Sequence, residues 1–116
     1  MKKFKKFLAV ASVAAMTLSL CACGGKKDDT YTVGICQLVQ HEALDAATKG
    51  FKDALVEEFG EDGIKFDEQN AQGDANTCAT IINGFVSSDV DLILANATPA
   101  LQAAAAGTDT IPILGT

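Results

Sequence analysis

The stretch Asp91-Leu92-Ile93-Leu94-Ala95-Asn96-Ala97-Thr98-Pro99 decides how the rest of the chain is organised. Its apolar run predicts a strand that is buried on both faces, and the Asn96-Ala97-Thr98-Pro99 turn predicts the start of a helix. Thr98 is the expected N-cap, because its hydroxyl can accept a hydrogen bond from an unpaired backbone N–H, and Pro99 suits the first helical position. Free N–H groups and the positive end of the helix dipole would then lie beyond the carboxyl end of the strand. Open parallel α/β sheets bind ligands at that edge.

The segments on either side of this strand alternate between helix and strand patterns. Apolar residues three or four positions apart predict a helix over 42–59 and a second helix that begins at its N-cap Asp74. The Ala-rich segment after Pro99 predicts a short helix with Gly107 as its C-terminal cap. Strands are expected at 31–38, 64–70 and 111–114, and Gly34 in the first of them indicates close approach by a neighbouring backbone or helix. The order βαβαβαβ predicts an α/β fold with a parallel sheet and right-handed crossovers.

The amino terminus has the pattern of an export signal. Four of the first six residues are Lys, and the apolar run over 7–20 that follows is shorter than the ~20 residues needed to span a bilayer. Leu20-Cys21-Ala22-Cys23 then resembles a bacterial lipobox, which implies removal of a signal peptide over 1–22 and a diacylglycerol on Cys23. A plain signal peptide that is cleaved elsewhere is the alternative. Residues 23–30 are small, polar and charged, so they predict a flexible tether before a folded part over 31–116.

Composition and charge bound the class of protein. The chain has 116 residues, of which 48% are hydrophobic, and this allows one small globular domain at most. The net charge is −6, and loss of residues 1–22 would leave five Lys against 15 acidic residues, a net charge of −10 without any Arg. Such a surface excludes a nucleic-acid binder. The segment Ile111-Pro112-Ile113-Leu114-Gly115-Thr116 resembles the start of a further strand and its turn, so we expect the sequence to be a fragment.

Two of the four cysteines, Cys36 and Cys78, fall in the expected folded part. Neither has a Cys or His at the spacing of a metal site. Buried free thiols that act as small apolar residues are the favoured interpretation. A disulfide, which export permits, stays open as the alternative.

Polar residues follow each expected strand, whereas catalytic motifs are missing. There is no Gly-rich phosphate loop, no GxSxG elbow and only one His, so no cofactor, metal or catalytic residue is expected. The carboxyl ends of parallel strands share one edge, and neutral donors there suit a zwitterion or a polar neutral solute. Each of these residues also has a structural alternative. Asn70 and Asn96 could only form turns, Thr98 could only cap its helix, and His41 could only cover the start of the helix that follows it. Asp67 and Glu68 are expected to be a solvated strand edge. The candidate ligand-binding residues are Gln40, His41, Asn70, Asn96, Ala97, Thr98 and Thr116.

Three segments, 37–45, 66–74 and 91–100, resemble the solute-binding lipoproteins of ABC importers, and in particular the group that includes tryptophan- and tyrosine-binding members. The resemblance implies the N-terminal lobe of a two-lobed, type I periplasmic-binding fold whose second lobe is missing here. It also implies that Gln40 and His41 contact the solute, and that Asn70, Ala97, Thr98 and Thr116 hold its carboxylate or amino group. Glu42 departs from the family, which usually has Pro at this position.

The function implied by this resemblance is solute capture outside the cytoplasm and not catalysis. A lipid-anchored protein would close its lobes on a small solute, by analogy an aromatic amino acid, and deliver it to a membrane permease coupled to an ATPase. Three alternatives stay open. The first is a sensor that presents its ligand to a membrane receptor. The second is an exported enzyme, although the sequence identifies no Ser or Cys partner for His41. The third is a receiver-like domain, although Gln37-Leu38-Val39 supplies no acidic cluster after the first strand.

Overall fold

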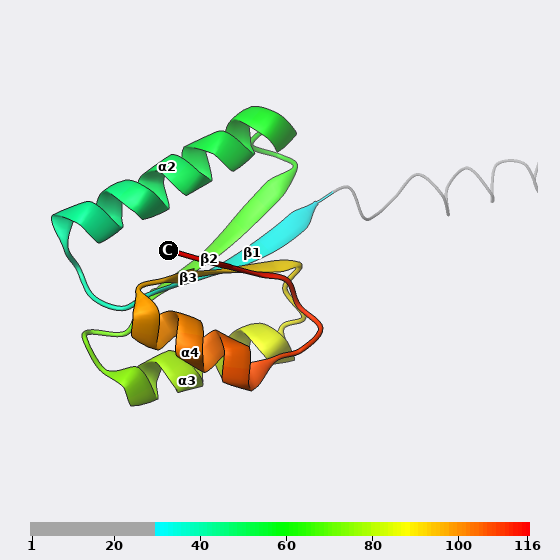
Figure 1. Cartoon of the computed structure of the whole chain (residues 1–116). Coiled ribbons are helices and arrows are strands. Elements are labelled where there is room, and N and C mark those ends of the chain that lie inside the picture. The colour runs from blue at the N-terminus through cyan, green and yellow to red at the C-terminus, as the bar shows by residue number, and fades with distance from the viewer. Residues whose placement is uncertain (1–29) are drawn as a thin grey trace, which may run out of the picture.

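The structure of this chain, a computed structural model, describes residues 30–116 (Figure 1). The predicted signal peptide over 1–22, the predicted lipid on Cys23 and the predicted tether up to residue 29 lie outside the described residues.

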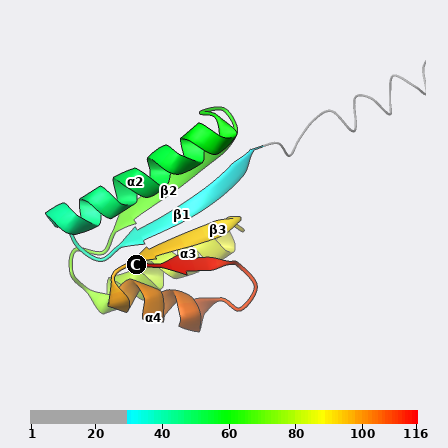
Figure 2. The same cartoon turned by 45° about the horizontal axis from the view of Figure 1, so that its top comes forward.

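Four strands and three helices alternate along the described residues. In chain order they are β1 (Tyr31–Gln37), α2 (Glu42–Phe59), β2 (Ile64–Asn70), α3 (Ala75–Ser87), β3 (Leu92–Asn96), α4 (Thr98–Gly107) and β4 (Ile113–Gly115). The strands form one sheet in the order β2-β1-β3-β4, and every neighbouring pair is parallel (Figure 2). The predicted parallel α/β fold is therefore confirmed. Because β2 and β3 flank β1 on opposite sides, the direction of winding reverses at β1, and such a switch point is where this class of sheet binds ligands.

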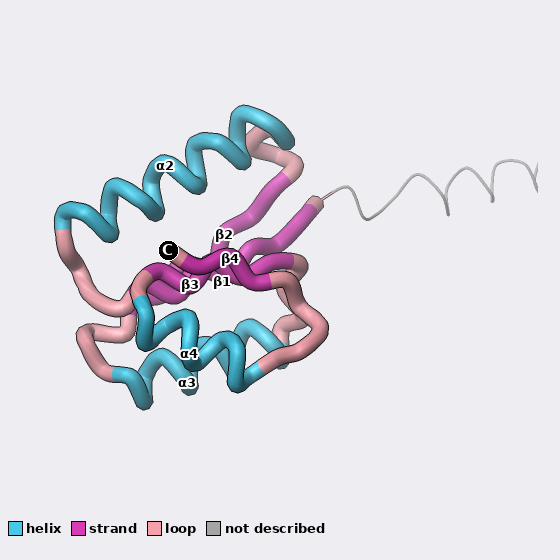
Figure 3. The backbone as a smooth tube through the Cα atoms, in the orientation of Figure 1, coloured by secondary structure: helices cyan, strands magenta, loops and turns pink. Residues whose placement is uncertain are grey.

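The helices cover the two faces of the sheet unequally. Helix α2 lies on one face, and α3 and α4 lie together on the other (Figures 1 and 3). Alternate residues of a strand point to opposite faces, so Val33 and Ile35 pack with Leu94 beneath α2 whereas Cys36 and Ile93 pack with α3 and α4. Both faces of β1 and β3 are therefore apolar over most of their length, as a sheet between two helical layers requires.

Gly34 permits the close approach that the sequence predicts. A Cβ atom at this position would lie 2.6 Å from Cγ of Phe85, whose side chain is 1% exposed. The ring of Phe85 comes from α3 and sits against the backbone of β1. Any side chain larger than hydrogen would push α3 away from the sheet.

Four boundary predictions were wrong. Strand β1 ends at Gln37, one residue before the expected end at Leu38. The N-cap of α4 is Ala97 and not Thr98, because the turn after β3 is one residue shorter than expected and Thr98 already has helical geometry. Gly107 is the last residue of α4 and not its cap, and it is small because a Cβ there would lie 2.6 Å from Cγ2 of Ile82. Strand β4 begins two residues later than expected, since Ile111 stays in the loop, where its N–H donates to Oγ1 of Thr108 at 3.2 Å.

Candidate functional site

A row of three amide side chains ends the first three strands. Gln37 of β1 lies in register with Asn70 of β2 on one side and with Asn96 of β3 on the other. These residues continue the alternation of Val33 and Ile35, so they belong to the sheet face that α2 covers. We call Asn70, Gln37 and Asn96 the amide row. It places amide groups at the carboxyl edge of the sheet, beside the switch point.

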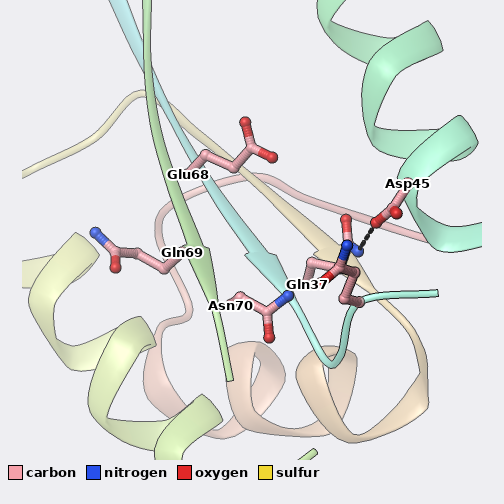
Figure 4. A pocket seen from close by; sticks show the side chains of 6 residues that line it. Gln37, Asp45, Glu68, Gln69 and Asn70 are labelled. Carbon is pink, nitrogen blue, oxygen red and sulfur yellow. Dashed lines mark hydrogen bonds between the residues drawn. The ribbon is translucent and has the colours of Figure 1, made fainter. Parts of the chain in front are cut away.

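Gln37 is the centre of the amide row and is 4% exposed. Its Nε2 donates to the carbonyl of Val39 at 2.9 Å and to Oδ1 of Asp45 at 2.6 Å, the second contact being drawn in Figure 4. Its Oε1 accepts from Oγ1 of Thr48 at 2.7 Å. One buried side chain thus ties the end of β1 to the loop that follows it and to the first turns of α2.

Asn96 is fully buried and does more than form a turn. Its Nδ2 donates to the carbonyl of Leu44 and to Oγ1 of Thr48, both at 2.9 Å. Its Oδ1 accepts from the hydroxyl of Thr116 at 2.7 Å. The side chain has no solvent-exposed surface, and its N–H groups donate to partners within the protein. Asn96 therefore stabilises the end of β3 from inside the fold.

An open hollow of about 350 Å³ lies beside the amide row (Figure 4). It is lined by amide and carboxylate side chains: Gln37, Gln40, Asp45, Glu68, Gln69 and Asn70. The structure thus brings two predicted site residues, Gln40 and Asn70, to one place. Oδ1 of Asn70 accepts from the N–H of Gln72 at 2.8 Å, which confirms its turn-forming role. Glu68 is exposed, as predicted, and pairs with Lys52 at 2.7 Å.

His41 follows Gln40 in the chain and is the N-cap of α2. Its Nδ1 accepts from the N–H of Ala43 at 3.1 Å, and its side chain is exposed. The prediction that His41 covers the start of its helix is therefore confirmed. Glu42 and Asp45 follow in the first helical turn, where their negative charge matches the helix dipole.

The turn between β3 and α4 is strained. Ala97 has φ 97° and ψ 156°, a conformation that only glycine adopts without penalty and that costs a residue with a Cβ about 1–3 kcal/mol. No side chain caps the start of α4, and the hydroxyl-bearing residue there, Thr98, is exposed. On the neighbouring strand the N–H of Thr116 donates to the carbonyl of Ala95 at 3.1 Å, so Thr116 continues the edge of the sheet beside Asn96.

Gln37, Asp45 and Thr48 were missed by reasoning from the sequence. A pattern for two of them was available. Gln37 falls on the period of two set by Val33 and Ile35, and Thr48 falls on the apolar stripe of α2 four residues after Leu44. A polar residue in such a position must find a buried partner. Which partner it finds depends on the register of the strands.

Cys36 and Cys78 are free and buried, as predicted. Burial raises the pKa of the Cys36 thiol to about 12, and the neighbouring Cys78 adds to that rise. Residues 30–116 contain no group of three or more His, Cys, Asp or Glu side chains that could hold a metal ion. No helix within the same residues is long and apolar enough to cross a membrane.

Comparison with known families identifies the fold. A sequence profile for "ABC transporter substrate binding protein" matches residues 32–116. The chain belongs to this substrate-binding protein family. A tyrosine-binding protein of Clostridioides difficile (strain R20291) is 50% identical over 86 residues, which are 72% of this chain and 25% of the relative.

Solved structures of substrate-binding proteins share the same arrangement. A ligand-free, open substrate-binding protein with adhesive properties from Clostridium difficile is 46% identical, with a TM-score of 0.71 over 74% of this chain and 30% of the other. An ABC domain in complex with L-Trp from Streptococcus pneumonia is 36% identical, with a TM-score of 0.70 over the same shares of the two chains. The predicted resemblance and the type I periplasmic-binding fold are confirmed. This chain of the family spans about 25–30% of the length of these relatives.

Proposed function

We propose that this chain is the N-terminal lobe of an extracytoplasmic solute-binding lipoprotein of an ABC importer. The lobe would capture an amino acid, with aromatic ones favoured, against a second lobe and deliver it to a permease coupled to an ATPase. The observation that carries the proposal is the amide row, which lies at the carboxyl edge of the sheet beside the switch point. The tyrosine-binding relative and the L-Trp complex support an aromatic amino acid as the ligand.

The hollow beside the amide row suits the ammonium end of an amino acid. Asp45 and Glu68 contribute carboxylates, and the side chains of Gln40 and Asn70 contribute amide oxygens and nitrogens. A primary ammonium has three N–H donors, and these oxygens are acceptors for it. A ligand without the ammonium would leave such groups desolvated and unpaired, and that penalty is a source of discrimination.

The start of α4 suits the carboxylate end. Its first N–H groups have no side-chain cap, and they carry the positive end of the helix dipole. The exposed hydroxyl of Thr98 is a further donor. Thr116, whose own hydroxyl donates to Oδ1 of Asn96, would border this end of the site from the end of β4. The strain at Ala97 supports a functional role, because a conformation that costs stability persists where the turn has a task. His41 and Gln40 would close the site from the loop after β1.

The same proposal covers the amino terminus. Residues 1–22 would be the signal peptide, Cys23 would carry the lipid, 23–30 would be the tether and 31–116 the lobe. Proteins of this family work outside the cytoplasm, which is consistent with an anchor of this kind. Replacement of Cys23 by Ser, which keeps size but removes the thioether linkage, is expected to move the protein from the membrane fraction to the soluble one. Membrane retention of Cys23→Ser, in cells that process a control lipoprotein, would argue for another anchor.

The binding proposal is tested by NMR on the ¹⁵N-labelled chain carrying Cys23→Ser, titrated with L-tryptophan and L-tyrosine. Amide shifts are expected at residues 40–41, 70 and 97–98. Tryptamine lacks the carboxylate and indole-3-propionate lacks the ammonium, so each is expected to bind more weakly and to lose the shifts at one end of the site. Thr98→Val is expected to weaken tryptophan binding, whereas Thr80→Val, the same change on the exposed side of α3, serves as the control. No shift at millimolar amino acid, or equal shifts with glucose, would refute the proposal.

A further inference from the structure

Thr48 has a buried hydroxyl group within helix α2, and it is not one of the proposed ligand contacts. It is 3% exposed and lies in the second turn of α2, on the face packed against the sheet. Its Oγ1 donates to Oε1 of Gln37 at 2.7 Å and accepts from Nδ2 of Asn96 at 2.9 Å. One hydroxyl therefore uses its donor on β1 and an acceptor lone pair on β3.

Each of these two partners holds a loop of the proposed site. Gln37 also donates to the carbonyl of Val39, the residue before Gln40, at 2.9 Å. Asn96 immediately precedes Ala97 and accepts the hydroxyl of Thr116 at 2.7 Å. The hydrogen bonds thus run without a break from the loop after β1, through Thr48, to the turn after β3 and the end of β4.

We infer that Thr48 is a positioning residue that fixes the two halves of the solute site relative to each other. The inference rests on the proposed function for its effect on ligand binding. The loop after β1, with Gln40 and His41, and the turn after β3, with Ala97 and Thr98, come from strands that end side by side. The last backbone hydrogen bond between them runs from the N–H of Leu38 to the carbonyl of Asn96 at 3.1 Å. Beyond that point the Thr48 hydroxyl links them through the side chains of Gln37 and Asn96.

A purely space-filling role does not account for this hydroxyl. Val has the same shape as Thr and would fill the same volume against the sheet, without needing partners. In residues 30–116 every buried side-chain nitrogen and oxygen has a hydrogen-bond partner, so loss of the hydroxyl would leave both Gln37 and Asn96 short of one. Buried amides re-orient to recover partners, and re-orientation of these two would move the loops that they hold.

The test compares Thr48→Val with Thr48→Ser, which keeps the hydroxyl and loses only the methyl group, with Thr80→Val as the matched control on α3. The dissociation constant for L-tryptophan is expected to rise about tenfold in Thr48→Val, a factor that corresponds to about 1.4 kcal/mol. It is expected to stay within about threefold of the wild type in Thr48→Ser, the size of effect of a weak, non-essential contact. Equal affinities in a folded Thr48→Val and in Thr48→Ser would overturn the inference.

A second measurement needs no ligand. Thr116→Val removes an exposed hydroxyl at the end of the chain of hydrogen bonds. Its effect is expected to reach the backbone amides of Gln40 and His41 as chemical-shift changes, and to stop at Asn96 when Thr48→Ala is also present. Shift changes confined to residues near Thr116 in the wild-type background would overturn the role of Thr48. A wild-type chain that binds no amino acid would refute the proposed function while leaving this second result to decide the inference.

Discussion

Replacement of Gly34 by Ala tests the packing of α3 on the sheet. The new Cβ would lie 2.6 Å from Cγ and Cδ2 of Phe85 and 2.9 Å from Cδ1, all closer than real Cβ contacts. The ring cannot swing away easily, because it is 1% exposed and enclosed by the core beneath α3 and α4. Insertion of a methyl group into such a core typically costs about 1–3 kcal/mol, so we expect a loss of about 2 kcal/mol in the free energy of unfolding. A small domain has only about 5–15 kcal/mol in total.

The assay is equilibrium urea unfolding followed by circular dichroism. Gly50→Ala is the matched control, since no atom lies within 4 Å of its Cβ position and it sits inside α2. The same chemical change there should raise stability by about 0.5–1 kcal/mol, because Ala is the better helix former. Adding Phe85→Leu to Gly34→Ala should recover part of the loss, so the double variant is more stable than the sum of the two single effects. Wild-type stability for Gly34→Ala, or strict additivity with Phe85→Leu, would refute the packing argument.

Three further outcomes are expected. Asn96→Leu should lower the unfolding free energy by about 2–4 kcal/mol, because the carbonyl of Leu44 and the hydroxyls of Thr48 and Thr116 would each lose a hydrogen-bond partner. A loss below about 1 kcal/mol in urea would contradict the role of this network. Asp74→Ala should lower the free energy of unfolding by about 1 kcal/mol, because it removes the N-cap of α3, and it should speed hydrogen exchange of the amides in the first turn of that helix. Unchanged exchange would show that the cap is dispensable. Burial raises the pKa of Cys36 from 9.0 to about 12, so its thiol should resist iodoacetamide at pH 8 until the chain is unfolded in urea. Since the unfolded chain releases that proton first, stability should be unaffected by this group below about pH 9 and should fall as the pH rises from about 9 towards 12. A Cys36→Ala variant with the same alkaline decline would contradict this assignment.

Most of the fold could be predicted because its patterns are local. The spacing of Leu44, Phe51 and Leu55 defines a helix with one buried face, and the run after Asp91 defines a strand with two. The errors concern one or two residues at element ends, where competing interactions decide. Thr98 has the chemistry of an N-cap, but the backbone turns at Ala97 in a conformation that no sequence rule assigns to Ala.

The candidate site could be predicted only as a set of loops. Asn70 and Asn96 occupy equivalent strand ends, and their sequence context gave both the same two interpretations. In the structure Asn70 borders an open hollow and Asn96 is fully buried. Asn96 is buried because α2 and the end of β4 cover it, and both are distant from it in sequence.

The sequence by itself determined the order of elements, the parallel sheet and the edge at which polar residues gather. These properties follow from hydrophobic period and turn chemistry, which act between residues a few positions apart. Only the tertiary structure decided that Gln37, Thr48 and Asn96 share one hydrogen-bonded path. That path depends on the register of three strands and on the depth at which α2 packs, and both result from the fold as a whole. The physical reason is that a buried polar group can form a hydrogen bond only with a group that another segment brings within about 3 Å of it.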